Sequence, residues 1–164
     1  MRRALFFSLI AVTSFLPTPA TAAGTWVWPV EGPVIRAFDP PDSPFGTGHR
    51  GIDIATPSSS PLVAPESGTV TFAGPVGGRL FVTIDHGGGV VSTLSFLEVV
   101  FVRKGDEVAA GETVALSGSG HADTEVDHVH LGVRLDDVYV DPLDYLEPLT
   151  VSGFIRLAPW NEGG

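Results

Sequence analysis

Cysteine is absent from this chain of 164 residues. Without cysteine the protein can form no disulfide, no cysteine-ligated zinc site and no thiol nucleophile, so a cysteine-type hydrolase mechanism is excluded. A lipid-anchored export signal is excluded on the same ground, because it needs a cysteine directly after its cleavage site. Any catalytic chemistry must therefore come from other side chains.

Long apolar runs are absent too, and the run near the start of the chain is typical of a secretory signal. Arg2 and Arg3 form a basic start, residues 4–16 an apolar run, and residues 20–22 (Ala-Thr-Ala) a small-x-small cleavage pattern. The apolar run is well below the ~20 residues that a membrane-spanning helix needs. We therefore expect residues 1–22 to be a cleaved signal peptide, and the mature chain to be secreted or placed in the cell envelope without a membrane anchor.

Basic residues are few, since nine lysines and arginines stand against 19 acidic residues and give a formal net charge of −10. Removal of Arg2 and Arg3 with the signal makes the mature chain −12 (−10 − 2), because residues 1–22 hold no acidic side chain. Such a chain is not expected to bind nucleic acid or anionic membranes through general electrostatics. Its partner must be recognised by a local site.

Stretches of helical period are lacking, whereas short alternating runs are frequent. The runs rich in β-branched and aromatic side chains are residues 68–73, 80–85, 90–95 and 129–134, with glycine-rich turns at 74–78 and 86–89. This pattern predicts antiparallel strands joined by hairpins. Residues 23–164 have the size of one domain, so we expect a single all-β domain. His86 lies in one of the turns, where we expect a turn residue and not a metal ligand.

Two short stretches carry most of the candidate chemistry, His49-Arg-Gly-Ile-Asp53 and His128-Val-His130. Side chains two or four positions apart on an extended strand lie on the same face. His49 and Asp53 therefore share one face, and the two histidines of the second stretch share another. If the two strands are neighbours, these groups come within reach of one metal ion. Two imidazoles and one carboxylate, with a fourth position left to water, are typical of a catalytic zinc site.

A rival prediction comes from residues 99–117, whose strand-turn-strand pattern also occurs in lipoyl and biotinyl carrier domains. Those domains need a lysine at a hairpin tip for covalent attachment of the cofactor. Lys104 is the single lysine of the chain, and it lies beside Gly105 without the neighbours of an attachment hairpin. We therefore set the carrier function aside.

Several motifs of the chain resemble those of the lysostaphin-type, or LytM-type, zinc metalloendopeptidases, which cut peptide bonds in bacterial peptidoglycan. The motifs are HRGID at 49–53, APESGTV at 64–70, DHGGG at 85–89, KGDEVAAGE at 104–112, HVHLGVR at 128–134 and DPLDYL at 141–146. The resemblance covers about residues 28–146. It implies the all-β duplicated hybrid motif, an antiparallel sheet or barrel-sandwich with a groove.

The resemblance also implies roles for the residues of the site. His49, Asp53 and His130 would bind Zn²⁺. His128 would be the catalytic histidine that acts on water or on the developing oxyanion. Asp127 beside it either orients the ring or is a solvated loop residue. The implied substrate is a peptide of peptidoglycan, and the oligomeric state stays open.

The chain departs from the family pattern at one position. Family members usually carry a second active-site histidine in a Tyr-x-His-Leu run, and residues 94–97 here are Leu-Ser-Phe-Leu. Phe96 in the place of the histidine can neither donate a hydrogen bond nor transfer a proton. We therefore expect slow hydrolysis unless another group takes over. His121, in the polar loop before the second stretch, is either that group or a solvated loop residue.

Two other functions stay open. One is a zinc-binding but weakly active or inactive regulator of other cell-wall hydrolases, as some relatives are after losing ligands. The other is a non-enzymatic module that binds the wall and needs no metal. All three implied ligands are present, which argues against complete loss of the site. Zinc content combined with a cell-wall cleavage assay separates the three functions.

Overall fold

The computed structural model describes residues 25–43, 46–121 and 125–148. The predicted signal peptide at residues 1–22 lies outside the described residues. The described ranges contain no helix with the length and hydropathy that a membrane-spanning segment requires.

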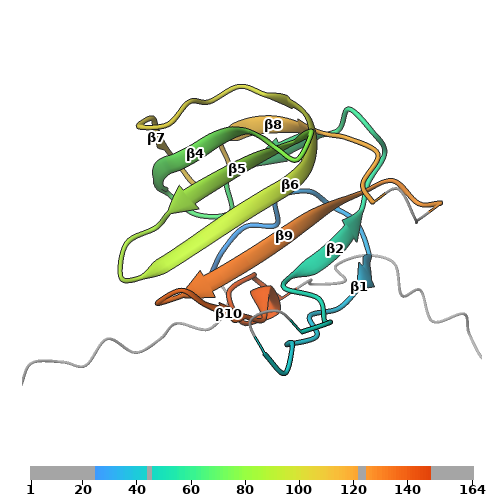
Figure 1. The fold of residues 1–164 in the computed structure, drawn as a ribbon. Helices are drawn as coiled ribbons and strands as arrows, with labels where there is room; N and C mark the ends of the chain where they lie inside the picture. Colours follow the sequence, from blue (N-terminus) through green and yellow to red (C-terminus); the bar gives the residue numbers. More distant parts are fainter. Residues whose placement is uncertain (1–24, 44–45, 122–124, 149–164) are drawn as a thin grey trace, which may run out of the picture.

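Ten strands and one short 3₁₀ helix make up the described structure (Figure 1). The elements in chain order are β1 (Val34–Arg36), β2 (Ile52–Ala55), β3 (Pro61–Val63), β4 (Gly68–Val76), β5 (Arg79–Asp85), β6 (Val90–Val100), β7 (Glu107–Val108), β8 (Thr113–Ser117), β9 (His128–Leu135), β10 (Val138–Val140) and η1 (Pro142–Asp144). Every pairing between these strands is antiparallel. The predicted all-β fold is confirmed, and the four predicted strands are present with longer bounds.

The strands form one sheet whose main path runs β1-β2-β9-β6-β5-β4-β7. β10 pairs with β9, and β8 joins β3 to β6. The two ends of the path do not pair with each other, so the described strands form no closed barrel. Figure 1 shows β2 beside the long strand β9, although the two are far apart in the sequence. This neighbourhood is what brings the two histidine stretches together.

The alternation of β2 and β9 fixes which side chains face the core. The core-facing side chains of the two strands are all fully buried: Ile52, Ile54, Val129, Leu131 and Val133. Asp53, His128 and His130 alternate with them and project from the opposite face. Burial of each apolar side chain stabilises the fold by about 1.5–3 kcal/mol. A shift of register by one residue would turn all of them away from the core, so the core also fixes the register of the site.

β6 changes its pairing partner at Phe96. Through Ser95 it pairs with β9, and from Leu97 onward it pairs with β8, while its register against β5 shifts across the same residue. The φ angle of Phe96 is 64°, in the left-handed region that few residues other than glycine adopt. Such a bulge redirects a side chain and often lies next to an active site. Here the ring of Phe96 packs against the ring of His121, with their centroids 4.0 Å apart.

Candidate metal centre

Two strands and one loop supply the predicted ligands. Asp53 on β2 lies directly opposite His130 on β9 in the register of the two strands. His49 lies at the end of the loop that leads into β2. Its backbone is fixed by a pair of hydrogen bonds with Asp39, at 2.7 Å from the N–H of His49 and 2.9 Å to its carbonyl. The ligand candidates therefore stand on paired backbone and not on a free loop.

Three donor atoms converge at this point of the sheet. His49 Nε2 lies 3.0 Å from His130 Nδ1 and 3.1 Å from Asp53 Oδ1, and the last two atoms are 2.8 Å apart. A tetrahedral zinc ion with bonds of 2.0–2.1 Å holds its ligand atoms about 3.3 Å apart, so the triangle is close to the required size. His49 and Asp53 are 4% and 1% exposed, while His130 keeps some access to solvent. The site is thus buried on one side and accessible on the other.

The tautomer of His49 leaves a lone pair that a cation could use. Its Nδ1 lies 2.8 Å from the carbonyl oxygen of Ala37, and because a carbonyl only accepts, Nδ1 carries the proton. In the neutral ring Nε2 then presents a lone pair to the carboxylate oxygen of Asp53. Two lone pairs at 3.1 Å repel each other unless a cation, or the Nδ1 proton of His130 at 3.0 and 2.8 Å from the two atoms, lies between them. A backbone carbonyl on the distal nitrogen is also the usual support of a metal-bound imidazole, so the residues present fit zinc.

Asp53 carries the negative charge that such a cation needs. Burial, the largest influence, would raise the pKa of its carboxyl group. The hydrogen bond from His130 and the charges of the neighbouring histidine rings together outweigh burial, so the pKa lies below its ordinary value. The carboxylate is therefore ionised at neutral pH, although the side chain is almost completely buried.

His128 lies beside the triangle and is fully buried. Its Nδ1 donates to the carbonyl of Val126 at 2.8 Å, and its Nε2 accepts the backbone N–H of His121 at 3.1 Å. Nε2 is 3.9 Å from Asp53 Oδ2, farther than the three converging atoms are from one another. Both ring nitrogens of His128 are thus engaged, and the ring is held in one orientation.

Asp127 does not orient the His128 ring, so that alternative is wrong. Its carboxylate accepts hydrogen bonds from the hydroxyl and the backbone N–H of Ser58, at 2.7 and 3.3 Å. The carbonyl of Val126, one residue earlier, supports the ring instead. A backbone group of this kind leaves no signal in the sequence.

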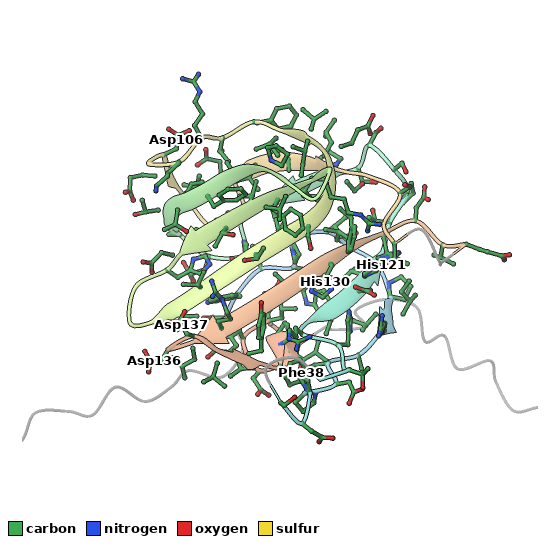
Figure 2. All side chains as sticks on the ribbon, viewed as in Figure 1. Phe38, Asp106, His121, His130, Asp136 and Asp137 are labelled. Atoms are coloured by element: carbon green, nitrogen blue, oxygen red, sulfur yellow. The ribbon has the colours of Figure 1, made fainter. Side chains whose placement is uncertain are left out.

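His121 is part of the site, which the sequence left undecided. Its ring stacks on that of His128 with centroids 5.2 Å apart and an angle of 25° between the planes. A ring nitrogen of His121 and the donor atoms of His49, Asp53 and His130 all lie within 4.8 Å of one another. Figure 2 shows His121 on the segment that precedes β9, close to His130 on β9 itself. The only signal in the sequence was a histidine seven positions before His128.

His86 lies in a separate polar cluster, in agreement with its prediction as a turn residue. Its Nδ1 donates to the carbonyl of Ser67 at 2.9 Å, and its Nε2 accepts from the hydroxyl of Ser92 at 2.8 Å. The ring packs on Trp26, a core residue, with centroids 4.6 Å apart. Burial lowers the pKa of His86, against the opposing effect of the Ser67 carbonyl.

Comparison with known proteins assigns the chain to a family. The family model of peptidase family M23 matches residues 47–142, more than half of the chain. The chain belongs to peptidase family M23. This M23 membership confirms the resemblance to lysostaphin-type enzymes that the motifs indicated.

Two relatives illustrate the range of the M23 family. An uncharacterized protein of Mycobacterium tuberculosis is 34% identical over 144 residues, which are 84% of this chain and 56% of that protein. The murein hydrolase activator NlpD of Escherichia coli is 33% identical over 129 residues, which are 77% of this chain and 32% of NlpD. The chain therefore spans about half or less of the length of these relatives.

Solved M23 structures share the fold. A zinc-containing peptidase from Vibrio cholerae superposes with a TM-score of 0.64 at 26% identity, over 75% of this chain and 40% of that one. Lysostaphin from Staphylococcus simulans superposes with a TM-score of 0.66 at 23% identity, over 87% of this chain and 62% of its own. The second likeness concerns the fold alone.

Proposed function

We propose that this M23 chain is a zinc-dependent endopeptidase that hydrolyses peptide bonds of bacterial peptidoglycan, with a low intrinsic rate. The convergence of donor atoms from His49, Asp53 and His130 within 3.1 Å carries the proposal. Membership of a peptidase family supports hydrolysis of a peptide bond. The likeness to a zinc-containing peptidase at 26% identity supports zinc as the ion.

The three converging residues would hold the ion, His49 through Nε2, Asp53 through Oδ1 and His130 through Nδ1. Bound zinc lowers the pKa of a coordinated water to about 7 and polarises the scissile carbonyl. The carbonyl of Ala37 keeps the proton of His49 on Nδ1, so Nε2 stays available as a donor. Asp53 supplies a permanent negative charge, because its pKa lies below the ordinary value.

His128 would move the proton. Val126 fixes its ring through Nδ1, which leaves Nε2 as the nitrogen on the side of the reacting groups. Once the hydrogen bond from His121 is released, Nε2 can accept a proton from the attacking water, and the resulting imidazolium can donate a hydrogen bond to the developing oxyanion. General acid and base catalysis of this type is worth about 100- to 10,000-fold in rate. Phe96 offers no second group for this task, which is the reason for a low rate.

A second candidate function is regulation of other cell-wall hydrolases. Phe96 favours the regulatory function, because it stands where the family has its second active-site histidine and leaves His128 as the sole assisting histidine of the family pattern. NlpD, which is 33% identical to this chain, is a murein hydrolase activator. The complete set of donors at His49, Asp53 and His130 favours the hydrolase.

We also propose that residues 1–22 direct export and that residues 23–164 act in the cell envelope or outside the cell. Peptidoglycan lies on that side of the membrane, so the proposed substrate and the predicted signal agree. Residues 23–164 carry a net charge of −12 (−10 − 2), which makes recognition through a local site more favourable than general attraction to an anionic surface.

The test uses residues 23–164 with purified peptidoglycan, with and without added zinc, and with His49→Ala as the metal-site control. A hydrolase releases soluble peptides in the presence of zinc, and a chelator or His49→Ala abolishes the release. Mass spectrometry of the products then identifies the bond that is cut. A regulator releases nothing alone but increases the release caused by a separate wall hydrolase, and that outcome would replace the endopeptidase proposal.

A further inference from the structure

We infer that His121 is a fourth protein ligand of the metal and that it closes the coordination site in this state of the protein. The inference rests on the proposed binding of zinc by His49, Asp53 and His130. A ring nitrogen of His121 lies within 4.8 Å of the donor atoms of these three residues. Its Nε2 is 3.9 Å from Asp53 Oδ2, as is Nε2 of His128, but the lone pair of His128 Nε2 already accepts the backbone N–H of His121. Small rotations of the rings bring four donors at this spacing onto one ion. Four protein donors make a closed site of the structural kind, whereas three leave a position for water.

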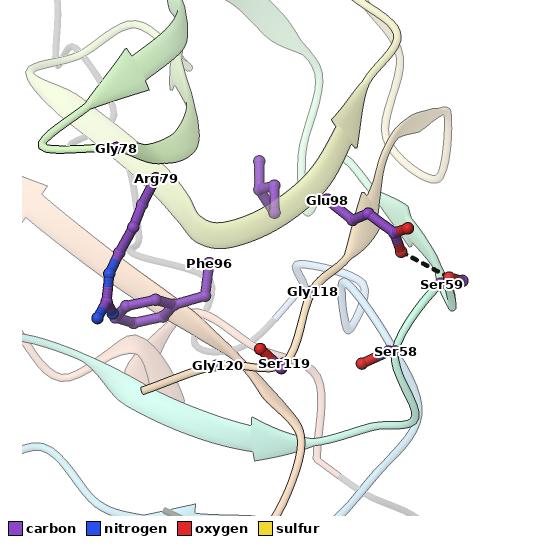
Figure 3. Close-up of a pocket in the computed structure, with 10 residues that line it drawn as sticks. Ser58, Ser59, Gly78, Arg79, Phe96, Glu98, Gly118, Ser119 and Gly120 are labelled. Carbon is purple, nitrogen blue, oxygen red and sulfur yellow. Dashed lines mark hydrogen bonds between the residues drawn. The ribbon is translucent and has the colours of Figure 1, made fainter. Parts of the chain in front are cut away.

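The rings around His121 hold it at the metal. The ring of Phe96 lies with its centroid 4.0 Å from that of His121, and the ring of His128 is stacked on His121 at 5.2 Å, while the rings of Phe96 and His128 are 5.8 Å apart. The guanidinium carbon of Arg79 lies 4.7 Å from the centroid of the Phe96 ring, and Figure 3 shows the Arg79 side chain extended along that ring. Phe96 therefore has a position in the site, as a platform that carries an imidazole from another segment.

The backbone before His121 is fitted to His128. The φ angle of Gly120 is +80°, and a Cβ atom on this residue would overlap Cε1 and Nδ1 of the His128 ring. The segment can therefore lie against the ring only because residue 120 is glycine. Two residues earlier, the N–H of Gly118 donates to the carbonyl of Phe96 at 2.8 Å. The segment that carries His121 is thus tied to the bulge in β6 as well as to the ring of His128.

The same segment also occupies the proposed base. The backbone N–H of His121 donates to Nε2 of His128, while Nδ1 of that ring donates to Val126. In this arrangement Nε2 has no lone pair left for a proton. His121 thus blocks hydrolysis twice, through its ring at the metal and through its backbone at His128. Hydrolysis requires that the ring of His121 leaves the ion and that its backbone N–H releases His128 Nε2.

Space for this displacement exists beside the site. A cavity of about 560 Å³ borders the segment from Gly118 to Gly120 and is also lined by Phe96 and Arg79 (Figure 3). His121 itself is 30% exposed at its side chain, so its removal from the ion leaves the buried core intact. The closed site is therefore a property of one partly exposed segment and not of the sheet.

The test compares zinc binding and coordination in the mature chain and in His121→Phe. Phenylalanine keeps an aromatic ring against those of Phe96 and His128 but supplies no donor. We expect its zinc affinity, measured by competition with a chelator, to fall by at least about tenfold, since loss of a group that merely supports a ligand already costs 10- to 100-fold. X-ray absorption at the zinc edge should count three imidazoles in the parent and two in the variant. The ligand-field bands of the cobalt(II)-loaded protein should shift accordingly.

Ser119→Ala is the matched control, because Ser119 is an exposed neighbour in the same segment that offers no metal ligand. It should bind zinc as the parent does. Equal zinc affinity and equal imidazole counts in the parent and in folded His121→Phe would overturn the fourth ligand and leave the proposed function intact. A parent chain that is folded but binds no zinc would overturn both. Circular dichroism and the melting temperature establish folding in each case.

Discussion

Phe96 and His121 are each expected to lower the rate of hydrolysis, the first because it replaces the family's histidine and the second because it closes the metal site. Exchange of the two rings separates these two effects. The double variant Phe96→His/His121→Phe keeps one phenyl and one imidazole ring in contact, at the place where the centroids are now 4.0 Å apart. It is compared with His121→Phe alone, in which the fourth ligand is also absent. The two proteins then differ only in the group at position 96.

The expected difference follows from the position of residue 96. Its ring lies 5.8 Å from the ring of His128 and 6.3 Å from that of His130, so an imidazole there adjoins the proposed reacting carbonyl. The left-handed backbone of residue 96, with φ of 64°, accepts histidine more readily than most residues. A hydrogen-bond donor to a developing oxyanion is worth about 100- to 1,000-fold in rate, or about 2.7–4 kcal/mol. We expect the double variant to exceed His121→Phe by that factor.

The substitution should cost little stability. The contact between Arg79 and the Phe96 ring is that of a cation with an aromatic face, which contributes about 0.5–1 kcal/mol at exposed sites. Rates are measured as soluble peptide released from purified peptidoglycan, at equal zinc content and with folding checked in each protein. Equal rates in the double variant and in His121→Phe would refute the reasoning, because position 96 would then not reach the reacting group.

Three further predictions concern single residues. His128→Ala should keep zinc and lose about 100- to 10,000-fold in rate, the worth of a general acid or base; loss of the metal in this variant would show that His128 is a ligand. In Gly51→Ala the new Cβ would overlap the carbonyl oxygen of Leu131 and lie 2.8 Å from His130 Nε2. We therefore expect a loss of about 1–3 kcal/mol in stability and weaker zinc binding, measured by thermal melting and by metal content. The pKa of His86 is lowered in the folded protein. As the pH falls, the unfolded chain therefore takes up the proton first. The stability that the neutral ring contributes above pH ~6.5 is then lost as the pH falls through the folded pKa. Melting temperatures between pH 8 and pH 5 should therefore fall less in His86→Gln than in the parent, and parallel curves would contradict this assignment.

Period-two alternation was sufficient to predict the part of the site that stands on strands. Ile52 and Ile54 are apolar and face the core, so Asp53 between them lies on the other face. In β9 the buried Val129 and Leu131 likewise place His128 and His130 on the other face. Because hydrophobic burial selects the register, the carboxylate of Asp53 and the ring of His130 had to meet once β2 and β9 paired. That the two strands are neighbours was an assumption at the sequence level.

The rest of the site depends on contacts between distant segments. The bulge at Phe96 arises where β6 changes its partner from β9 to β8, and the alternating sequence around it continues without a break. His121 reaches the candidate metal centre because Gly120 fits against the His128 ring, a contact that a local pattern does not encode. The support of His128 by the carbonyl of Val126 is likewise a backbone contact, for which any residue would serve.

Anomalous X-ray diffraction at the zinc edge, from crystals of residues 23–164 grown with zinc, tests the central claim most directly. We expect one peak about 2.0–2.2 Å from His49 Nε2, Asp53 Oδ1 and His130 Nδ1. The absence of a peak between these atoms in zinc-saturated crystals would contradict it. A peak bound by His128 in place of His130 would contradict the assignment of ligand and catalytic residue.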